Sequence, residues 1–139
     1  MAGGIRARAL APMETERMDS TSVRMGVPFV LRFVVTTSDS TITIRNTFSD
    51  AFHVVRAYGY MTQGGAGSDT AVVNQINAAG TTTAITDTAD LSAFADTEQF
   101  DFSEIDDAVN DIQVNEQLSI TTASSPACVI FCDCVWLNP

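Results

Sequence analysis

Apolar side chains recur at every second position over much of the chain, and this alternation begins at residue 27. A strand over VPFVLRFVVTT (27–37) would place on one face Val27, Phe29, Leu31, Phe33 and Val35. A period of two is the repeat of a β-strand, whose successive side chains point to opposite faces. The segment is therefore predicted to be a strand with one buried face.

Six further segments read as strands: 41–45, 50–62, 70–77, 81–88, 115–123 and 128–136. In the segment 50–62, alternation places Phe52, Val54, Tyr58 and Tyr60 on one face together with Arg56. The last segment is apolar on both faces except at Asp133, which predicts a central strand buried on two sides.

One segment favours a short surface helix. SEIDDAVNDI (103–112) opens with Ser103 as a candidate N-cap, and Ile105, Val109 and Ile112 share one stripe at helical spacing. About seven or eight strands with one helix, and no alternation of strands with helices, predict an all-β antiparallel sandwich or jelly roll.

The 139 residues suit one domain preceded by an arm. Residues 1–26 have no lasting period, so an extended N-terminal arm is predicted there and a jelly-roll-like β-sandwich domain over 27–139.

Charge is distributed unevenly along the chain. The net charge is −10, there is no lysine, and all seven arginines lie in residues 1–56. Residues 57–139 hold acids and no base, which argues against nucleic acid as a partner. In the arm, the candidates for contact with an acidic protein surface are Arg6, Arg8, Arg17 and Arg24. A solvated tail is the simpler alternative.

No apolar run approaches the roughly 18 residues of a membrane span, and the start of the chain lacks the apolar region of a secretory signal. We therefore expect no membrane partner and folding in a reducing cytosol. Three cysteines cannot all pair within the chain, which agrees with free thiols.

The motifs of catalysis are missing from the sequence. The single histidine, His53, sits in a predicted strand between apolar neighbours and is expected to be structural. Without lysine the chain has no Schiff base and no phosphate-clamping ammonium group. The expectation is a protein that is not an enzyme, with no cofactor and no small-molecule substrate.

Two clusters resemble metal sites without matching one. Cys128, Cys132 and Cys134 share a strand face with Ile130 and Trp136, but a structural zinc site needs a fourth ligand, so buried packing is favoured. A second group surrounds the predicted helix: Asp101, Glu104, Asp106, Asp107 and Asp111. It lacks the calcium-loop pattern and is expected to be a solvated helix face. The glycines of 63–70 suit a strand connection better than a phosphate cradle.

Four segments carry a resemblance to a known family: VVRAYGYMTQGGAGSDTAVVNQ (54–75), AITDTADLS (84–92), SEIDDAVNDI (103–112) and LSITTASSPACVIFCDCVW (118–136). Together they resemble the head-decoration (cement) proteins of tailed bacteriophages, over roughly residues 40–137. The long arm and the cysteine-rich last strand depart from that pattern.

The resemblance implies a structural protein, often a homotrimer, that binds the major capsid protein on the outer surface of the virion and stabilises the shell. It supplies no catalytic residue. Two alternatives stay open: another virion component, such as a head-fibre or tail host-binding module, and a free β-sandwich ligand-binding module. The second would use exposed aromatics, for which Tyr58, Tyr60 and Trp136 are candidates, although their spacing suits core or subunit contact better.

Overall fold

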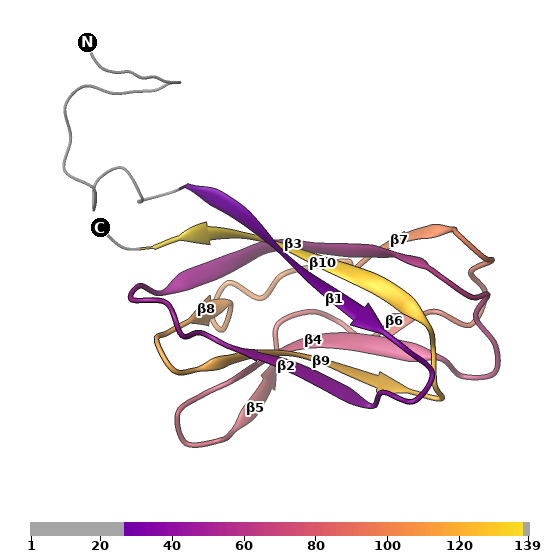
Figure 1. The fold of residues 1–139 in the computed structure, drawn as a ribbon, viewed down its shortest axis with the longest axis horizontal. Coiled ribbons are helices and arrows are strands. Elements are labelled where there is room, and N and C mark those ends of the chain that lie inside the picture. The colour runs from indigo at the N-terminus through magenta and orange to yellow at the C-terminus, as the bar shows by residue number, and fades with distance from the viewer. Residues whose placement is uncertain (1–26, 138–139) are drawn as a thin grey trace, which may run out of the picture.

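The computed structural model describes residues 27–137, and ten β-strands make up its regular structure (Figure 1). The strands are β1 (Pro28–Val35), β2 (Thr41–Arg45), β3 (Phe52–Met61), β4 (Thr70–Ile76), β5 (Thr82–Ala84), β6 (Ala89–Asp90), β7 (Gln99–Asp101), β8 (Asp111–Ile112), β9 (Gln117–Ala123) and β10 (Cys128–Trp136). The predicted arm, residues 1–26, lies outside the described residues.

The strands form two antiparallel sheets that pack face to face. The first sheet has the order β1-β10-β3-β7, with β8 also paired to β3, and the second has the order β2-β9-β4-β5, with β6 also paired to β4. In Figure 1 the first sheet is the upper layer and the second sheet the lower one. The predicted all-β antiparallel sandwich is confirmed, and the strands beyond the predicted seven or eight are short segments of two or three residues.

Alternate side chains of β1 enter the core between the sheets. Phe33 and Val35 are 2% exposed, and Phe29 and Leu31 pack against the same core. Val27, which was predicted on this face, precedes the strand and is 39% exposed. The period-two pattern therefore identified the buried face of β1 correctly from Phe29 onward.

The last strand, β10, is central as predicted, because it lies between β1 and β3. Its inward side chains Cys128, Ile130, Cys132 and Cys134 are each 0% exposed. The prediction of burial on both faces is only half right. Phe131, on the outward side, is half-buried, since nothing in the described part of the chain packs over it fully.

The predicted helix over 103–112 is wrong, and none of the described residues is helical. Instead of capping a helix, the hydroxyl of Ser103 donates to Asp87 Oδ2 at 3.1 Å. Ile105 forms an isolated bridge to Thr86, which ties the loop to the neighbouring segment. A ten-residue helix is marginal without tertiary support, and Ser, Asp and Asn readily form turns instead.

The apolar stripe that suggested the helix fastens this loop to the core. Ile105 and Val109 pack against the core, and Ile112 is buried in β8, which pairs with β3. Asn110 bonds the backbone of Val54 twice, through its carbonyl (3.1 Å from the Val54 nitrogen) and its side-chain amide (2.8 Å to the Val54 oxygen). Apolar residues at helical spacing therefore anchor an irregular loop to the core.

A β-bulge in β3 overturns the predicted shared face of that strand. Asp133 lies opposite Arg56, whereas Cys134 lies opposite Val54, so Val55 is the extra residue. A bulge of this kind reverses which side chains point inward on its far side. Phe52 and Val54 are buried, but Tyr58 and Tyr60 point outward with Arg56, and Ala57, Gly59 and Met61 take the inward positions.

The backbone of β10 lies against Gly59, and this contact generates a stability prediction. A Cβ added at Gly59 would lie 2.2 Å from the carbonyl oxygen of Val129. Gly59→Ala should therefore lower the free energy of unfolding by about 3 kcal/mol or more, as overpacking in a rigid core does. Gly67, at φ +57° with open space around it, is the control, and Gly67→Ala should cost only about 1 kcal/mol. Urea denaturation measures both. Equal losses in the two variants would contradict the close approach.

Candidate interaction surfaces

The outward side of the first sheet carries an aromatic cluster, here named the aromatic face: Tyr58, Tyr60 and Phe131. Tyr58 and Phe131 are opposite each other in the β3–β10 register, with ring centroids 5.5 Å apart, and the Tyr60 ring lies 6.2 Å from Phe131. All three side chains are half-buried. Such a cluster presents a large apolar area at low cost in side-chain entropy.

Charged groups hold the aromatic face in place. The Arg56 guanidinium lies 4.2 Å above the Tyr58 ring and donates to Asp101 Oδ1 at 2.8 Å. The Tyr58 hydroxyl donates to Asp133 Oδ1 at 2.9 Å, and this hydrogen bond raises the pKa of Tyr58. The hydrogen bond to Asp101 raises the pKa of Arg56 in the same way. These contacts orient the side chains of Arg56 and Tyr58 on the aromatic face.

Of the aromatics proposed for ligand contact, Trp136 does not belong to this face. Its ring stacks on Phe29 at 4.5 Å and meets Phe52 edge-on at 6.1 Å, at one end of the core. The structure therefore separates Trp136 from Tyr58 and Tyr60. Phe131, which the sequence placed in a doubly buried strand, takes its place beside them.

The outward side of the second sheet has a different character. It is built from hydroxyl and amide side chains, among them Thr41, Thr43, Asn74, Ser119 and Thr121. Asn74 donates to the Thr121 hydroxyl at 2.9 Å. The two outer faces of the sandwich are therefore chemically unlike: the first carries clustered aromatic rings, and the second carries mainly hydroxyl side chains together with Val72 and Arg45.

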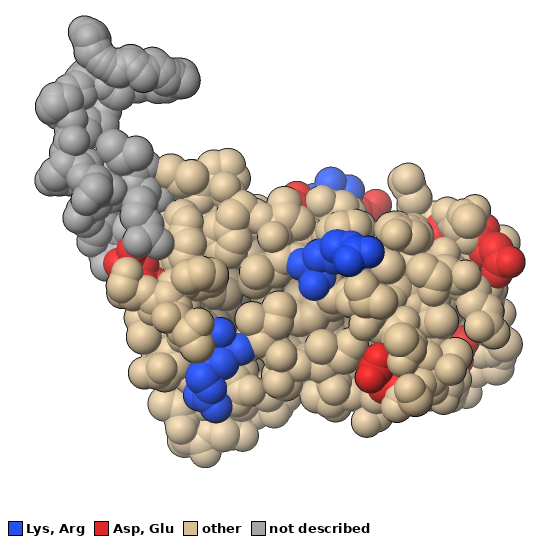
Figure 2. Space-filling model, in the orientation of Figure 1, with Lys and Arg blue, Asp and Glu red and all other residues tan. Residues whose placement is uncertain are grey.

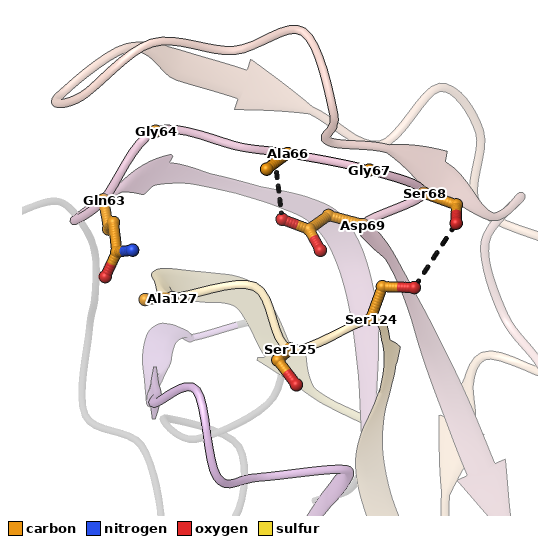
Figure 3. A pocket seen from close by; sticks show the side chains of 9 residues that line it. All are labelled: Gln63, Gly64, Ala66, Gly67, Ser68, Asp69, Ser124, Ser125 and Ala127. Atoms are coloured by element: carbon orange, nitrogen blue, oxygen red, sulfur yellow. Dashed lines mark hydrogen bonds between the residues drawn. The ribbon is translucent and has the colours of Figure 1, made fainter.

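A polar pocket of about 290 Å³ lies where the chain crosses between the sheets, after β3 and after β9. Figure 3 shows Ser68 and Ser124 facing each other across it, with their hydroxyl oxygens 3.4 Å apart. Asp69 is 5% exposed and accepts the N–H of Ala66 at 3.0 Å. The pocket lacks the apolar and aromatic lining that small-molecule sites usually have.

The turn beneath this pocket has an uncommon backbone. Ser124 and Ser125 both have positive φ, at 65° and 66°, a conformation that costs free energy in residues other than glycine. The turn is held by the two strands it connects, β9 in the second sheet and β10 in the first. Its role in the described structure is to carry the chain across the sandwich.

The three cysteines are free thiols in the core, as expected. Burial raises the pKa of Cys128 to about 11 and that of Cys134 to about 12, and it raises the pKa of Cys132 as well. A thiol that stays protonated is a poor nucleophile and a poor metal ligand. Among the described residues, no group of His, Cys, Asp or Glu is arranged to hold a metal ion.

Several carboxylates near residues 103–112, where a helix was predicted, line a hollow. Asp87, Glu104, Asp106 and Asp107 line a depression of about 420 Å³, so these acids cover a loop surface and not the predicted helix face. His53, predicted to be structural, lies on β3 with its Nδ1 3.6 Å from Asp111 Oδ1 in β8.

The arginines predicted to contact a partner, Arg6, Arg8, Arg17 and Arg24, lie outside the described residues. Within residues 27–137, no helix is long and apolar enough to span a bilayer.

No protein-family model and no curated protein matches this sequence. The structure of infectious bursal disease virus, Gx strain, is similar at 17% identity, over 94% of this chain and 36% of that chain, with a TM-score of 0.42. The VP2 subviral particle of the same virus is similar at 15% identity, over 96% of this chain and 38% of that chain, with a TM-score of 0.34.

A third similar structure holds the CBM22-1-GH10 modules of the xylanase Xyn10B from Clostridium thermocellum. Identity is 13%, over 81% of this chain and 27% of that chain, and the TM-score is 0.33. The chain thus spans about a third of the length of the solved chains it matches. These TM-scores are below the level that marks a shared fold, and the likeness carries no functional inference.

The buried thiols generate a prediction about pH. The folded pKa values of about 11 for Cys128 and about 12 for Cys134 exceed the ordinary 9.0, so the folded chain keeps protons that the unfolded chain has already released. The free energy of unfolding should therefore fall as pH rises above about 9. Urea titrations at about pH 8 and about pH 10.5 measure the slope, which Cys134→Ala should make shallower. An unchanged slope in that variant would contradict the assignment.

Proposed function

We propose that this chain is a structural subunit of a virus particle, and specifically a decoration (cement) protein on the outer surface of a tailed-phage head. The observation that carries the proposal is the aromatic face, where Tyr58, Tyr60 and Phe131 lie half-exposed beside Arg56. Tyrosine, phenylalanine and arginine are enriched in protein–protein contacts and supply most of their binding energy. The resemblance of residues 54–75 and 118–136 to decoration proteins supports the same role.

In this proposal the aromatic face lies on the major capsid protein. The central rings would be excluded from water, and the charged groups Arg56 and Asp101 would form part of the polar rim. Contacts built in this way depend on a few central side chains.

The arginine-bearing arm supplies a second contact with the capsid through Arg6, Arg8, Arg17 and Arg24. A homotrimer would present three bodies and three arms at once, and linking contacts raises overall affinity by about 10²–10⁴. The net charge of −10 suits a subunit outside the shell, because an acidic body is repelled by the packaged nucleic acid. The protein works by adhesion and needs no cofactor.

The central test uses undecorated heads mixed with the purified protein. Binding should be stoichiometric over the whole shell, and decorated heads should rupture at a higher temperature. Tyr60→Ala should weaken binding by about tenfold or more, as the loss of a central aromatic does. Val72→Ala, on the outward side of the second sheet, is the matched control and should bind as the unchanged protein does. Protein that neither binds nor protects would refute the proposal. Binding confined to vertices or to the tail would support a fibre or host-binding module instead.

The arm is tested by deleting residues 1–26. The shortened chain should keep its β-type circular dichroism spectrum and its urea midpoint, because the described sandwich is complete from residue 27. Its affinity for heads should fall, and the affinity should lose part of its salt dependence, since four arginines are removed. Full binding by the shortened chain would show that the body alone attaches.

A further inference from the structure

The sandwich has two edges of opposite charge. On one side the edge strands are β1 and β2, which carry Arg32 and Arg45, and we name this side the basic edge. Figure 2 shows blue side chains over these strands, with few red ones near them. On the other side lie the short strands β5 to β8, and we name residues 87–111 the acidic edge. This segment holds nine carboxylates and no base: Asp87, Asp90, Asp96, Glu98, Asp101, Glu104, Asp106, Asp107 and Asp111.

The basic edge also has backbone groups that are open to a partner. The N–H of Trp136 donates to the carbonyl of Val27 at 3.2 Å. Val27 and every second residue after it in β1 therefore point their backbone N–H and C=O groups toward β10. The groups of Val30, Arg32 and Val34 therefore point away from it, and β1 pairs with no other strand in the described part of the chain. An open strand edge of this length is a surface that proteins normally cover or protect.

Arg32 stands at the centre of this open edge. It is exposed, and no hydrogen bond or ion pair holds it to another described residue. The exposed valines Val30 and Val34 flank it on the same side of β1. A positive group between two apolar side chains suits a negatively charged surface, and the net charge of −10 disfavours nucleic acid as that surface.

The acidic edge offers a complementary shape. Asp87, Glu104, Asp106 and Asp107 line the depression of about 420 Å³. A second hollow of about 370 Å³ adjoins it beside Ile105 and is lined by the ion pair of Arg56 and Asp101. Carboxylates around a depression match the planar fork of a guanidinium group. Arg32, unpaired among the described residues, and the carboxylate-lined depression thus lie on opposite edges of the same molecule.

We propose that copies of this chain associate edge to edge, with the basic edge of one copy against the acidic edge of the next. In this contact Arg32 enters the depression formed by Asp87, Glu104, Asp106 and Asp107. The two surfaces differ, so the contact is heterologous and gives a closed ring when the rotation between copies closes. The proposal deepens the homotrimer of the proposed function and depends on that function only for the number of copies.

Sedimentation velocity of the full chain tests the contact without any capsid. The chain should be associated in about 0.05 M salt and should dissociate in about 0.5 M salt, because salt screens exposed charges. Arg32→Glu should weaken association by about tenfold or more. Its matched control, Thr62→Glu with Gln63→Glu, makes the same change in net charge on the exposed loop after β3 and should associate normally.

A charge swap makes the test specific. Glu104→Arg with Asp107→Arg should also prevent association, while a chain that carries these changes together with Arg32→Glu should associate again. An equimolar mixture of the two dissociated variants should associate as well, since each supplies the edge that the other lacks. Urea denaturation confirms that each variant is folded.

Three results would overturn the inference: a monomer in low salt, association that Arg32→Glu leaves unchanged, or a swap that fails to restore it. If deleting residues 1–26 abolished association and Arg32→Glu had no effect, the acidic edge would bind the N-terminal arm of a neighbouring copy instead. Capsid binding is measured separately. Association without capsid binding would refute the proposed function and support the contact between copies. Capsid binding by a monomer would support the proposed function and refute this contact.

Discussion

The structure depends on burying one row of side chains on the last strand. Cys128, Ile130, Cys132 and Cys134 have no exposure, and their strand lies between β1 and β3 in the first sheet. Because β10 is the last strand in the sequence, its two pairings connect residues about a hundred and about seventy positions apart. The first sheet is therefore completed only when the C-terminal segment is in place, and the second sheet then covers its inner side.

This arrangement leaves the two outer faces free to differ. The first sheet presents Tyr58, Tyr60 and Phe131 among charged groups, whereas the second presents mainly threonines, such as Thr41 and Thr43. Such a division is typical of proteins that adhere on one side and are solvated on the other. In the proposed role, the capsid contact uses the aromatic face and the contact between copies uses the two edges, and these surfaces adjoin where Arg32 lies opposite Phe131.

Much of the fold follows from alternation in the sequence, and what the alternation missed has physical causes. The buried face of β1 and the central place of β10 were readable because these strands are regular over their whole length. The helix over 103–112 was wrong because Ile105, Val109 and Ile112 fasten a loop to both sheets, a tertiary effect that a local period cannot reveal. The aromatic face was missed for a related reason, since nothing in the sequence marks Val55 as the bulged residue.

That bulge has a consequence for how the surface of this protein can change. A strand with an unbroken period of two would carry Tyr58 and Tyr60 into the interior, where Ala57 and Gly59 now fit against β10. The bulge at Val55 thus decides whether these large rings fill the core or lie on the exterior, with every side chain unchanged. In a lineage of such proteins, deletion of Val55 would leave a regular strand with the rings still outward, whereas a change that closed the bulge and kept Val55 would turn them into the interior.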